Sequence, residues 1–280
     1  MNALTGAAIS RIHECVIERG QAYWAAHPHL RQVIVENLNR FDRTGNDELI
    51  DRIEHNILLH YAEKLVLGLA EPAELATFLR EQIDLGDSLK MVKKNQAAPT
   101  AVLLAACHFG AVELIAPALA LAHLPVVGAL KFATGHFADG MRARAAAMQA
   151  SGLFGPVDFV EIGKPGSVAA LEMAAVLRRQ QVLLGVFDER TAYSSPVELF
   201  GKKVWGGAGL ERIIRFSNVP VAVYSAMMVR QSGGRYQLEL CQQNESGSSI
   251  INGFYAHLER TLDHYIEQWY FLHEEIAFVR

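Results

Sequence analysis

The sequence predicts an α/β protein in which a central, mostly parallel sheet is flanked by helices, with a helical region at its N-terminal end. Residues 1–95 carry apolar side chains at helical spacing, whereas after Thr100 short apolar runs alternate with amphipathic segments. Such alternation is typical of a parallel sheet covered by helices. The chain has 280 residues, of which 51% are hydrophobic, so it can bury a core without a disulfide or a structural metal.

The helical region is predicted from two apolar stripes and one proline. The first stripe comprises Ile12, Cys15, Val16 and Ile17, and the second comprises Leu58, Leu59, Ala62, Leu65, Val66 and Leu69. Pro72 falls in the first turn of a further helix, where proline is well tolerated. We therefore expect residues 1–95 to form a helical N-terminal region packed on the core, and residues 96–280 to form the α/β domain.

The α/β part is predicted to begin with a buried strand and to end with an amphipathic helix. Strands are expected at 101–106, 124–130, 157–161, 181–187, 221–229 and 236–240, the last two joined as a hairpin through 232–234. Helices are expected at 112–121, 136–151, 167–180, 206–216 and 250–270. Ligands of parallel sheets bind beyond the carboxyl ends of the strands. His108 and Asp188 each follow a predicted strand end, so we expect their side chains to meet in one cleft.

Composition argues against several classes of protein. A formal charge of −4 and a pI of about 6.3 disfavour a nucleic-acid surface and strong adhesion to anionic membranes. Neither a secretory signal nor a transmembrane helix is expected, since the apolar stretch 111–130 is interrupted by charges and prolines. Three cysteines without a CxxC spacing indicate a reduced, intracellular protein without a bound metal. Cys107 is expected to be buried and inert.

The pair His108 and Glu113 is the strongest candidate for catalysis. An apolar run leads into the histidine, and the carboxylate follows five positions later. A histidine held by a carboxylate at the end of a buried strand can serve as a general base. Gly110 would let the chain turn so that Glu113 reaches back to the imidazole. The alternative for Glu113 is an acid placed at a helix N-terminus, where the helix dipole favours it.

The segment His108-Phe-Gly-Ala-Val-Glu113 resembles the H-x4-D/E motif of the glycerolipid (lysophospholipid) acyltransferase superfamily. It is most similar to the branch of lauroyl and myristoyl acyltransferases that add the late acyl chains in lipid A biosynthesis. The similarity covers roughly residues 98–275. It includes the stretch with Arg142 and Arg144, the segments 187–190 and 197–201, the segment 206–229, Arg230 and the segment 266–270, where isoleucine stands in place of the family's proline.

This resemblance implies an acyltransferase that moves an acyl group from acyl carrier protein or coenzyme A to a hydroxyl of a lipid or glycolipid. His108 would be the general base and Glu113 would orient it. The resemblance implies no bound cofactor, since acyl-ACP or acyl-CoA is the co-substrate. It also implies a cytoplasmic protein, either free or in peripheral contact with the inner face of the cytoplasmic membrane.

The resemblance also implies substrate-binding residues, each with a plainer alternative. Arg142 and Arg144 would form a fork for phosphate, or lie on a solvated helix face. Asp188 and Arg190 would order the cleft or bind substrate, or form a strand-end turn. Gly206 and Gly207 would open a helix and present N–H groups to an anion, or make a turn. Arg230 would contact substrate, or lie at the surface beyond a strand.

Three other functions remain open. The chain lacks the membrane-anchoring helix and basic surface usual in the lipid A branch, and it reads Asp-Glu-Arg where Asp-x-Asp is common. These departures favour a soluble acyltransferase for a small-molecule alcohol or amine in a specialised biosynthetic pathway. A second alternative is a non-catalytic module that binds lipid or carrier protein. A third is a hydrolase, in which water replaces the acceptor.

Overall fold

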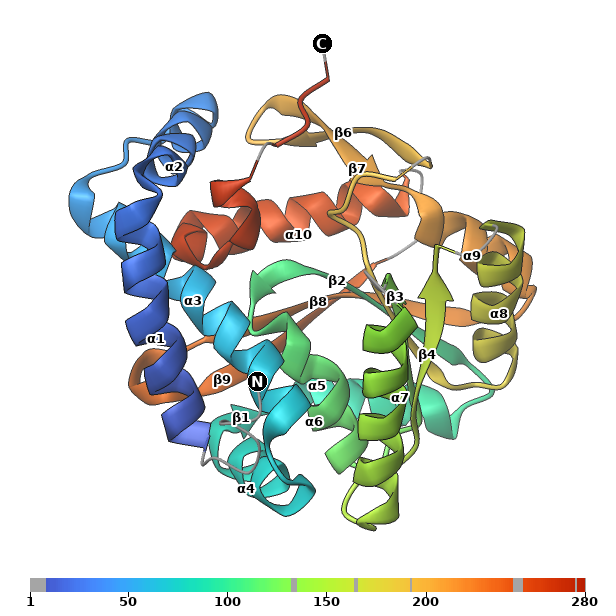
Figure 1. Ribbon diagram of the computed structural model, residues 1–280. Helices are drawn as coiled ribbons and strands as arrows, with labels where there is room; N and C mark the ends of the chain where they lie inside the picture. The colour runs from blue at the N-terminus through green and yellow to red at the C-terminus, as the bar shows by residue number, and fades with distance from the viewer. Residues whose placement is uncertain are drawn as a thin grey trace.

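The computed structural model describes residues 9–131, 135–163, 166–191, 193–243, 249–274 and 276–279. Within these ranges seven strands form one sheet in the order β1-β9-β8-β2-β5-β3-β4 (Figure 1). The strands are β1 (Ile83–Asp84), β2 (Ala101–Gly110), β3 (Val126–Lys131), β4 (Val157–Ile162), β5 (Val182–Val186), β8 (Val221–Arg230) and β9 (Tyr236–Gln243). All neighbouring strands are parallel except β8 and β9, which form the expected antiparallel hairpin. The predicted α/β fold is confirmed.

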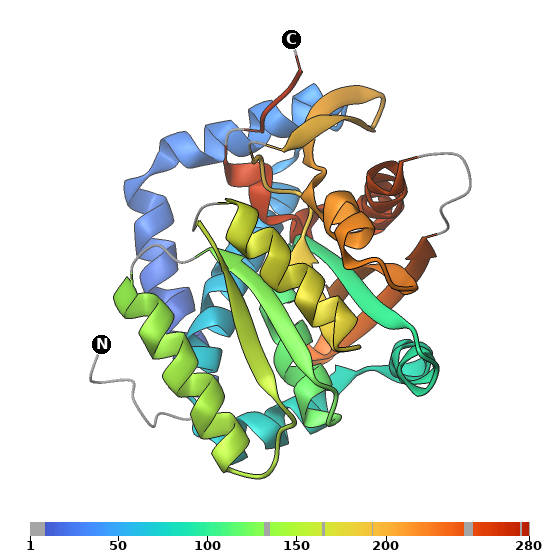
Figure 2. The ribbon, with the colours of Figure 1, turned by 90° about the vertical axis from the view of Figure 1, so that its right-hand side faces the viewer.

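Helices cover both faces of the sheet, and β2 shows how the two faces are divided. Its Leu103, Cys107 and Phe109 join a core cluster that includes residues of α8 (Gly166–Arg178), α9 (Gly209–Ser217) and α10 (Ile250–Tyr265). Leu104 and Ala106 join the opposite cluster, with residues of α6 (Ile115–Leu121) and α7 (Gly135–Ala150). Figure 2 shows α8 lying along one of these faces. Because successive side chains of a strand point to opposite faces, the continuous apolar run 101–107 is what a doubly covered strand requires.

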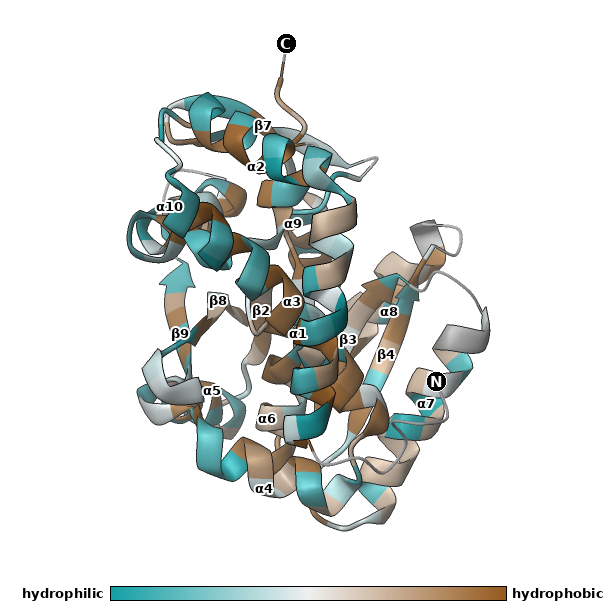
Figure 3. Ribbon diagram, turned by 60° about the vertical axis from the view of Figure 1, so that its left-hand side comes forward, coloured by the Kyte–Doolittle hydropathy of each residue, from teal (hydrophilic) through white to brown (hydrophobic). Residues whose placement is uncertain are grey.

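The N-terminal region is helical, as predicted. It contains α1 (Ile9–Ala26), α2 (Pro28–Arg40), α3 (Asp47–Leu69), α4 (Pro72–Gln82) and α5 (Gly86–Ala97). The Asn46 side chain caps α3 by accepting the Leu49 N–H at 2.8 Å. Figure 3 shows polar residues on the outward side of α1 and α2 and hydrophobic residues at the centre of the sheet. The short strand β1, which pairs with β9, was not expected in this region.

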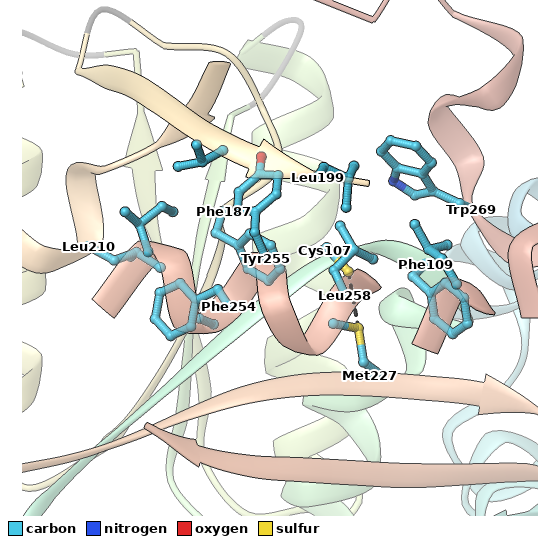
Figure 4. Packing of buried hydrophobic residues seen from close by; sticks show 14 of the residues in the cluster. Cys107, Phe109, Phe187, Leu199, Leu210, Met227, Phe254, Tyr255, Leu258 and Trp269 are labelled. Carbon is cyan, nitrogen blue, oxygen red and sulfur yellow. Dashed lines mark hydrogen bonds between the residues drawn. The ribbon is translucent and has the colours of Figure 1, made fainter. Parts of the chain in front are cut away.

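The core beside the site is built from aromatic and sulfur-containing side chains (Figure 4). Phe109, Phe187 and Phe254 are fully buried within it. Cys107 is buried as predicted, with its Sγ 3.2 Å from Sδ of Met227. Burial, and secondarily the Asp188 carboxylate, raises the pKa of this thiol well above its ordinary value. Cys107 is therefore a packing residue with no thiolate character at neutral pH.

A two-stranded ribbon was missed in the sequence. It consists of β6 (Ser194–Leu199) and β7 (Lys202–Gly207), which pair antiparallel and pack on α10. Phe200 and Gly201 form the turn between them, with φ of +51° and +68°. Hairpin turns of this type need positive φ at both central residues, and phenylalanine is a rare choice for that conformation. The resemblance implied a turn at residues 197–201, but the two strands that flank it were not predicted.

Two helix boundaries also differ from expectation. Gly206 and Gly207 end β7 instead of opening a helix, and α9 begins at Gly209. The last helix, α10, ends at Tyr265 instead of continuing to residue 270. Beyond it the 3₁₀ turns η3 (Ile266–Gln268) and η4 (Tyr270–His273) bring Trp269 into a bridge with Phe109. Among the described helices, none combines the length and apolar character that a membrane span requires.

Candidate active site

His108 and Asp188 meet at the carboxyl ends of two adjacent parallel strands, as expected. β2 pairs with β5 up to the pair Ala106 and Val186. His108 and Asp188 each follow two positions later in their own segment. His108 Nδ1 lies 2.9 Å from Asp188 Oδ1, and the His108 main-chain N–H donates to Oδ2 at 2.8 Å. The Asp188 side chain is 1% exposed. One buried carboxylate thus holds both the ring and the backbone of His108, which favours the tautomer protonated at Nδ1 and leaves Nε2 to accept a proton.

The other ring nitrogen of His108 faces a second carboxylate. Nε2 lies 3.5 Å from Oε1 of Glu189, and the His108 side chain is 15% exposed. Burial on its own lowers the pKa of His108, but the nearby carboxylates of Asp188, Glu189 and Glu113 outweigh it. The net effect raises the pKa of His108 above its ordinary value. The imidazole is therefore a stronger base than a free histidine.

Glu113 does not orient His108, contrary to the expectation from the sequence. Its Oε1 lies 3.3 Å from Nζ of Lys64 and 3.9 Å from Nε2 of His60, both on α3. Gly110 does make the predicted turn, with φ of +56°, and a Cβ there would lie 1.9 Å from the Met228 carbonyl oxygen. The turn leads into the 3₁₀ helix η1 (Val112–Leu114), which directs Glu113 toward α3. The orienting role falls to Asp188.

His60, on α3, is a buried polar group beside the site that no sequence motif identified. Its side chain is 2% exposed, and neither ring nitrogen has a hydrogen-bond partner in the described structure. The ring centroid lies 4.5 Å from that of Tyr270 and 6.4 Å from that of His108. Burial, followed by the charge of Lys64, lowers the pKa of His60 well below its ordinary value. His60 is therefore neutral at physiological pH.

Aromatic residues after α10 cover His108, a contact that was not predicted. The Phe271 ring centroid lies 4.8 Å from that of His108. The Tyr270 hydroxyl lies 2.7 Å from that of Tyr61, which joins this segment to α3. These side chains shield the imidazole from solvent on one side. The only hint in the sequence was the run Trp269-Tyr270-Phe271 at the expected end of a helix.

A cavity of about 230 Å³ opens beside His108. Its lining is mainly apolar and comes from α3, α6, α7 and η1 and from strands β2, β3, β4 and β5. The apolar residues include Val112, Ala116, Met141, Met148, Phe159 and Leu184, and the polar residues are Lys64, His108, Glu113, Lys131, Arg144 and Glu189. A mainly apolar cavity with a few convergent polar groups is the usual form of a small-molecule site. A chain of methylene groups bound here would have its polar end within reach of His108.

Arg142 and Arg144 do not form the expected fork. They are two positions apart on α7, a spacing that places side chains on different sides of a helix. Arg144 lines the cavity and donates through Nη2 to the Ala70 carbonyl, and its Nε has no partner among the residues that the structure describes. Arg142 is exposed and pairs with Asp139 at 3.3 Å and Glu161 at 3.1 Å. The solvated-face alternative thus holds for Arg142, whereas Arg144 remains a candidate for substrate contact.

Arg230 is neither a surface residue nor placed to bind substrate. Its Nε and Nη2 donate to the two carboxylate oxygens of Glu63 at 2.8 and 2.7 Å, and both side chains are buried. Nη2 also donates to the Gly110 carbonyl oxygen at 2.7 Å. A bidentate pair of this kind is geometrically specific. Arg230 therefore ties α3 to the end of β2, two residues beyond His108.

The predicted anion cradle at Gly206 and Gly207 is also wrong. The Gly207 N–H donates to the Phe187 carbonyl at 2.8 Å, and Gly206 lies opposite Ser195 in the β6–β7 ribbon. A Cβ on Gly206 would come within 3 Å of Tyr255 and Val197, so these glycines serve close packing. The Arg190 guanidinium does not pair with Asp188, but lies 5.9 Å from the centroid of Trp205.

Within the described ranges, no three His, Cys, Asp or Glu side chains are grouped closely enough to hold a metal ion. Comparison with known proteins adds no assignment: no protein-family model matches this chain, and no curated protein is significantly similar to it. The chemistry of the site must therefore be argued from its geometry.

Proposed function

We propose that this protein is an acyltransferase that moves an acyl group from a thioester donor, acyl carrier protein or coenzyme A, to a hydroxyl of a lipid or glycolipid acceptor. The observation that carries the proposal is the His108–Asp188 pair beside an apolar cavity. A buried carboxylate fixes the imidazole at 2.9 Å, and His108 lines the cavity together with Glu189, whose Oε1 lies 3.5 Å from Nε2. The resemblance of the segment 108–113 to the H-x4-D/E motif agrees with this assignment.

The proposed reaction uses the substrate's own hydroxyl as nucleophile. Nε2 of His108 accepts the hydroxyl proton as the oxygen attacks the thioester carbonyl. Asp188 stabilises the imidazolium that forms, as the aspartate of a serine-protease triad does. Collapse of the intermediate breaks the C–S bond, and the proton passes from His108 to the departing thiolate. Glu113, Lys64 and Glu189 line the same cavity and shape its charge without holding the ring.

The cavity beside His108, called the first cavity below, supports an acyl substrate because its lining is mainly apolar. Its walls include side chains of α6 and α7, and its polar residues include His108 and Arg144. An acyl chain inserted among the methionines, alanines and Phe159 would leave its carbonyl next to the imidazole. Burial of each methylene of the chain contributes about 0.8 kcal/mol, which gives affinity for long acyl groups.

Purified protein should be incubated with radiolabelled acyl-ACP and acyl-CoA and a pooled extract of lipids and small metabolites. His108→Gln and Asp188→Asn are the test variants, and His29→Ala, which changes an exposed histidine on α2, is the matched control. We expect a labelled product with wild type and control that is lost in both test variants. Donors that stay intact with wild type, or a product that His108→Gln still makes, would refute the proposal.

A small-molecule acceptor is the second candidate for the same chemistry. The formal charge of −4 favours it, because an acidic protein is repelled by anionic lipid surfaces. Sedimentation with vesicles of phosphatidylglycerol and phosphatidylethanolamine separates the two acceptors. A lipid acceptor requires binding to vesicles and a labelled product in the organic phase, whereas a small alcohol or amine requires a labelled product that stays in water without vesicle binding.

A further inference from the structure

A second cavity lies beside Asp188, the partner of His108. It measures about 330 Å³, and its lining includes Asp188, Glu189 and Phe271, the residue whose ring contacts His108. Lys131 and Glu189 line both this cavity and the first one. The two cavities therefore adjoin at these two residues, next to Asp188. Together they can hold two parts of one extended substrate that meet beside the proposed base.

The second cavity continues into a larger surface hollow of about 930 Å³. The two share Arg190, Trp205, Ile276 and Ala277, so we treat them as one feature, the hairpin groove, named after the β6–β7 ribbon that lines it. Its inner end lies at Asp188 and Glu189, close to the proposed base. Its outer end lies between the ribbon and residues 276–279.

The charge of the hairpin groove changes along its length. The described lining of the outer hollow contains three cations, Arg40, Arg190 and Lys202, and no carboxylate. Lys202 pairs with Asp42 at 2.8 Å, whereas Arg40 and Arg190 contact only aromatic rings among the described residues, Phe278 at 5.4 Å and Trp205 at 5.9 Å. Two guanidinium groups that lie beside a hollow and have no anionic partner within the described ranges are suited to binding a phosphate.

The inner part of the groove is lined by the ring of a buried tryptophan. The Trp269 side chain is buried and lines this cavity, yet its Nε1–H has no acceptor in the part of the chain that the structure describes. A buried donor without an acceptor is costly and uncommon. The Nε1 atom itself has almost no exposed surface, so the cavity meets the indole ring and not this donor.

We infer that the hairpin groove binds the phosphopantetheine arm of the thioester donor. The arm carries a thioester at one end, two amides in its middle and a phosphate at the other end. The inner end of the groove lies at Asp188, which holds the His108 base, and its outer end carries the arginines at 40 and 190, so the thioester and the phosphate match its two ends. The inference rests on the proposed function, and it leaves the first cavity for the acyl chain. Coenzyme A and acyl carrier protein carry the same arm, so the groove serves either source.

Binding can be measured without turnover, because two of the three tryptophans, Trp205 and Trp269, line the groove. Phosphopantetheine, pantetheine, coenzyme A and holo-acyl carrier protein should be titrated by calorimetry and by tryptophan fluorescence. We expect phosphopantetheine to bind at least tenfold more tightly than pantetheine, which lacks the phosphate, and to change the fluorescence. Coenzyme A and the carrier protein, titrated separately, identify the natural source of the arm.

The double variant Arg40→Gln/Arg190→Gln tests the phosphate contact. It should weaken phosphopantetheine binding about tenfold or more and leave pantetheine binding unchanged. Arg235→Gln, which changes an exposed arginine on the β8–β9 loop, is the matched control and should bind like wild type. Both altered side chains of the double variant contact only ring faces, so the fold should tolerate their removal; a thermal melt checks this.

Three results would overturn the inference. The first is equal affinity for pantetheine and phosphopantetheine, and the second is unchanged phosphopantetheine binding in the double variant. The third is a wild-type protein that binds anionic vesicles but not phosphopantetheine, together with a double variant that no longer binds the vesicles. That result would assign the arginines to a membrane surface. Failure of the proposed function is a separate outcome: the arm binds as expected, but no donor is consumed in the transfer assay.

Discussion

Nδ1 of His108 lies 2.9 Å from Oδ1 of Asp188, although 80 residues separate them in the chain. Parallel pairing of β2 with β5 brings these strand ends together. The same carboxylate accepts the His108 main-chain N–H, so the ring and backbone are fixed by one group. A rigidly oriented imidazole is the feature that distinguishes a catalytic base from an ordinary buried histidine.

Replacing Asp188 with asparagine should reduce the rate of acyl transfer by about 10²–10⁴-fold, because the amide can favour the wrong histidine tautomer and cannot stabilise the imidazolium. Single-turnover assays with saturating acyl donor measure this effect directly. Glu113→Gln is the informative comparison, since Glu113 contacts Lys64 and not the ring. A larger loss in Glu113→Gln than in Asp188→Asn would return the orienting role to Glu113.

Acyl transfer should increase with pH through the pKa of His108, since the base must be neutral to accept a proton. Surrounding carboxylates outweigh burial and raise this pKa, so the midpoint should lie above 6.5. Asp188→Asn should shift the acidic limb of the profile to lower pH, because it removes the nearest negative charge. Rates measured between pH 5 and 9 test this, and an unshifted limb would show that another group controls the profile.

Loss of one partner of the Arg230–Glu63 pair should be strongly destabilising. Arg230→Met leaves the Glu63 carboxylate buried without a counter-charge, which costs about 3–5 kcal/mol of unfolding free energy. The double variant Glu63→Leu/Arg230→Met removes both charges and should lose less than Arg230→Met alone. The free energy of unfolding should be measured in urea for wild type, both single variants and the double variant, which together form a double-mutant cycle. If the losses of the two single variants simply add up in the double variant, the pair is not coupled.

His257 should make the protein sensitive to acid. Its Nδ1 lies 2.7 Å from Oγ of Ser225, and burial, followed by the charge of Arg260, lowers the pKa of His257 to about 4. Between pH 6.5 and 4 the unfolded chain therefore binds a proton that the folded chain excludes, and stability falls as the pH falls. The loss from this group reaches about 2 kcal/mol at pH 5.

His257→Gln tests this prediction because glutamine can still hydrogen-bond to Ser225 but does not titrate. Unfolding free energies should be compared at pH 8 and pH 5. We expect a smaller decrease in the variant than in wild type. Equal decreases in both proteins would place the acid sensitivity elsewhere.

The sheet and the meeting of His108 with Asp188 could be predicted because they depend on local patterns. Continuous apolar runs identify doubly covered strands, and polar residues after such runs fall at the edge where ligands bind. The β6–β7 ribbon could not be predicted in this way, since its turn uses Phe200 at positive φ. Residue propensities for turns do not predict a phenylalanine at positive φ.

The partners of Glu113 and Arg230 could not be predicted, because neither is set by nearby sequence. The spacing of His108 and Glu113 suggests contact, but the direction taken after Gly110 depends on packing against the Met228 carbonyl. Arg230 finds Glu63 at a separation of 167 residues, with no motif at either end. His60 and Phe271 approach His108 in the same way, by tertiary packing alone.

Helix α3 also determines how the chain can be divided. A fragment that started at residue 96 would retain Arg230 and Gly110 but lose Glu63 and Asn56, which hydrogen-bond the guanidinium at 2.7–3.2 Å. It would also lose Lys64, the partner of Glu113. Helix α3 thus forms part of the wall of the cavity beside His108, and a fragment without it would lose that wall together with the buried partner of Arg230.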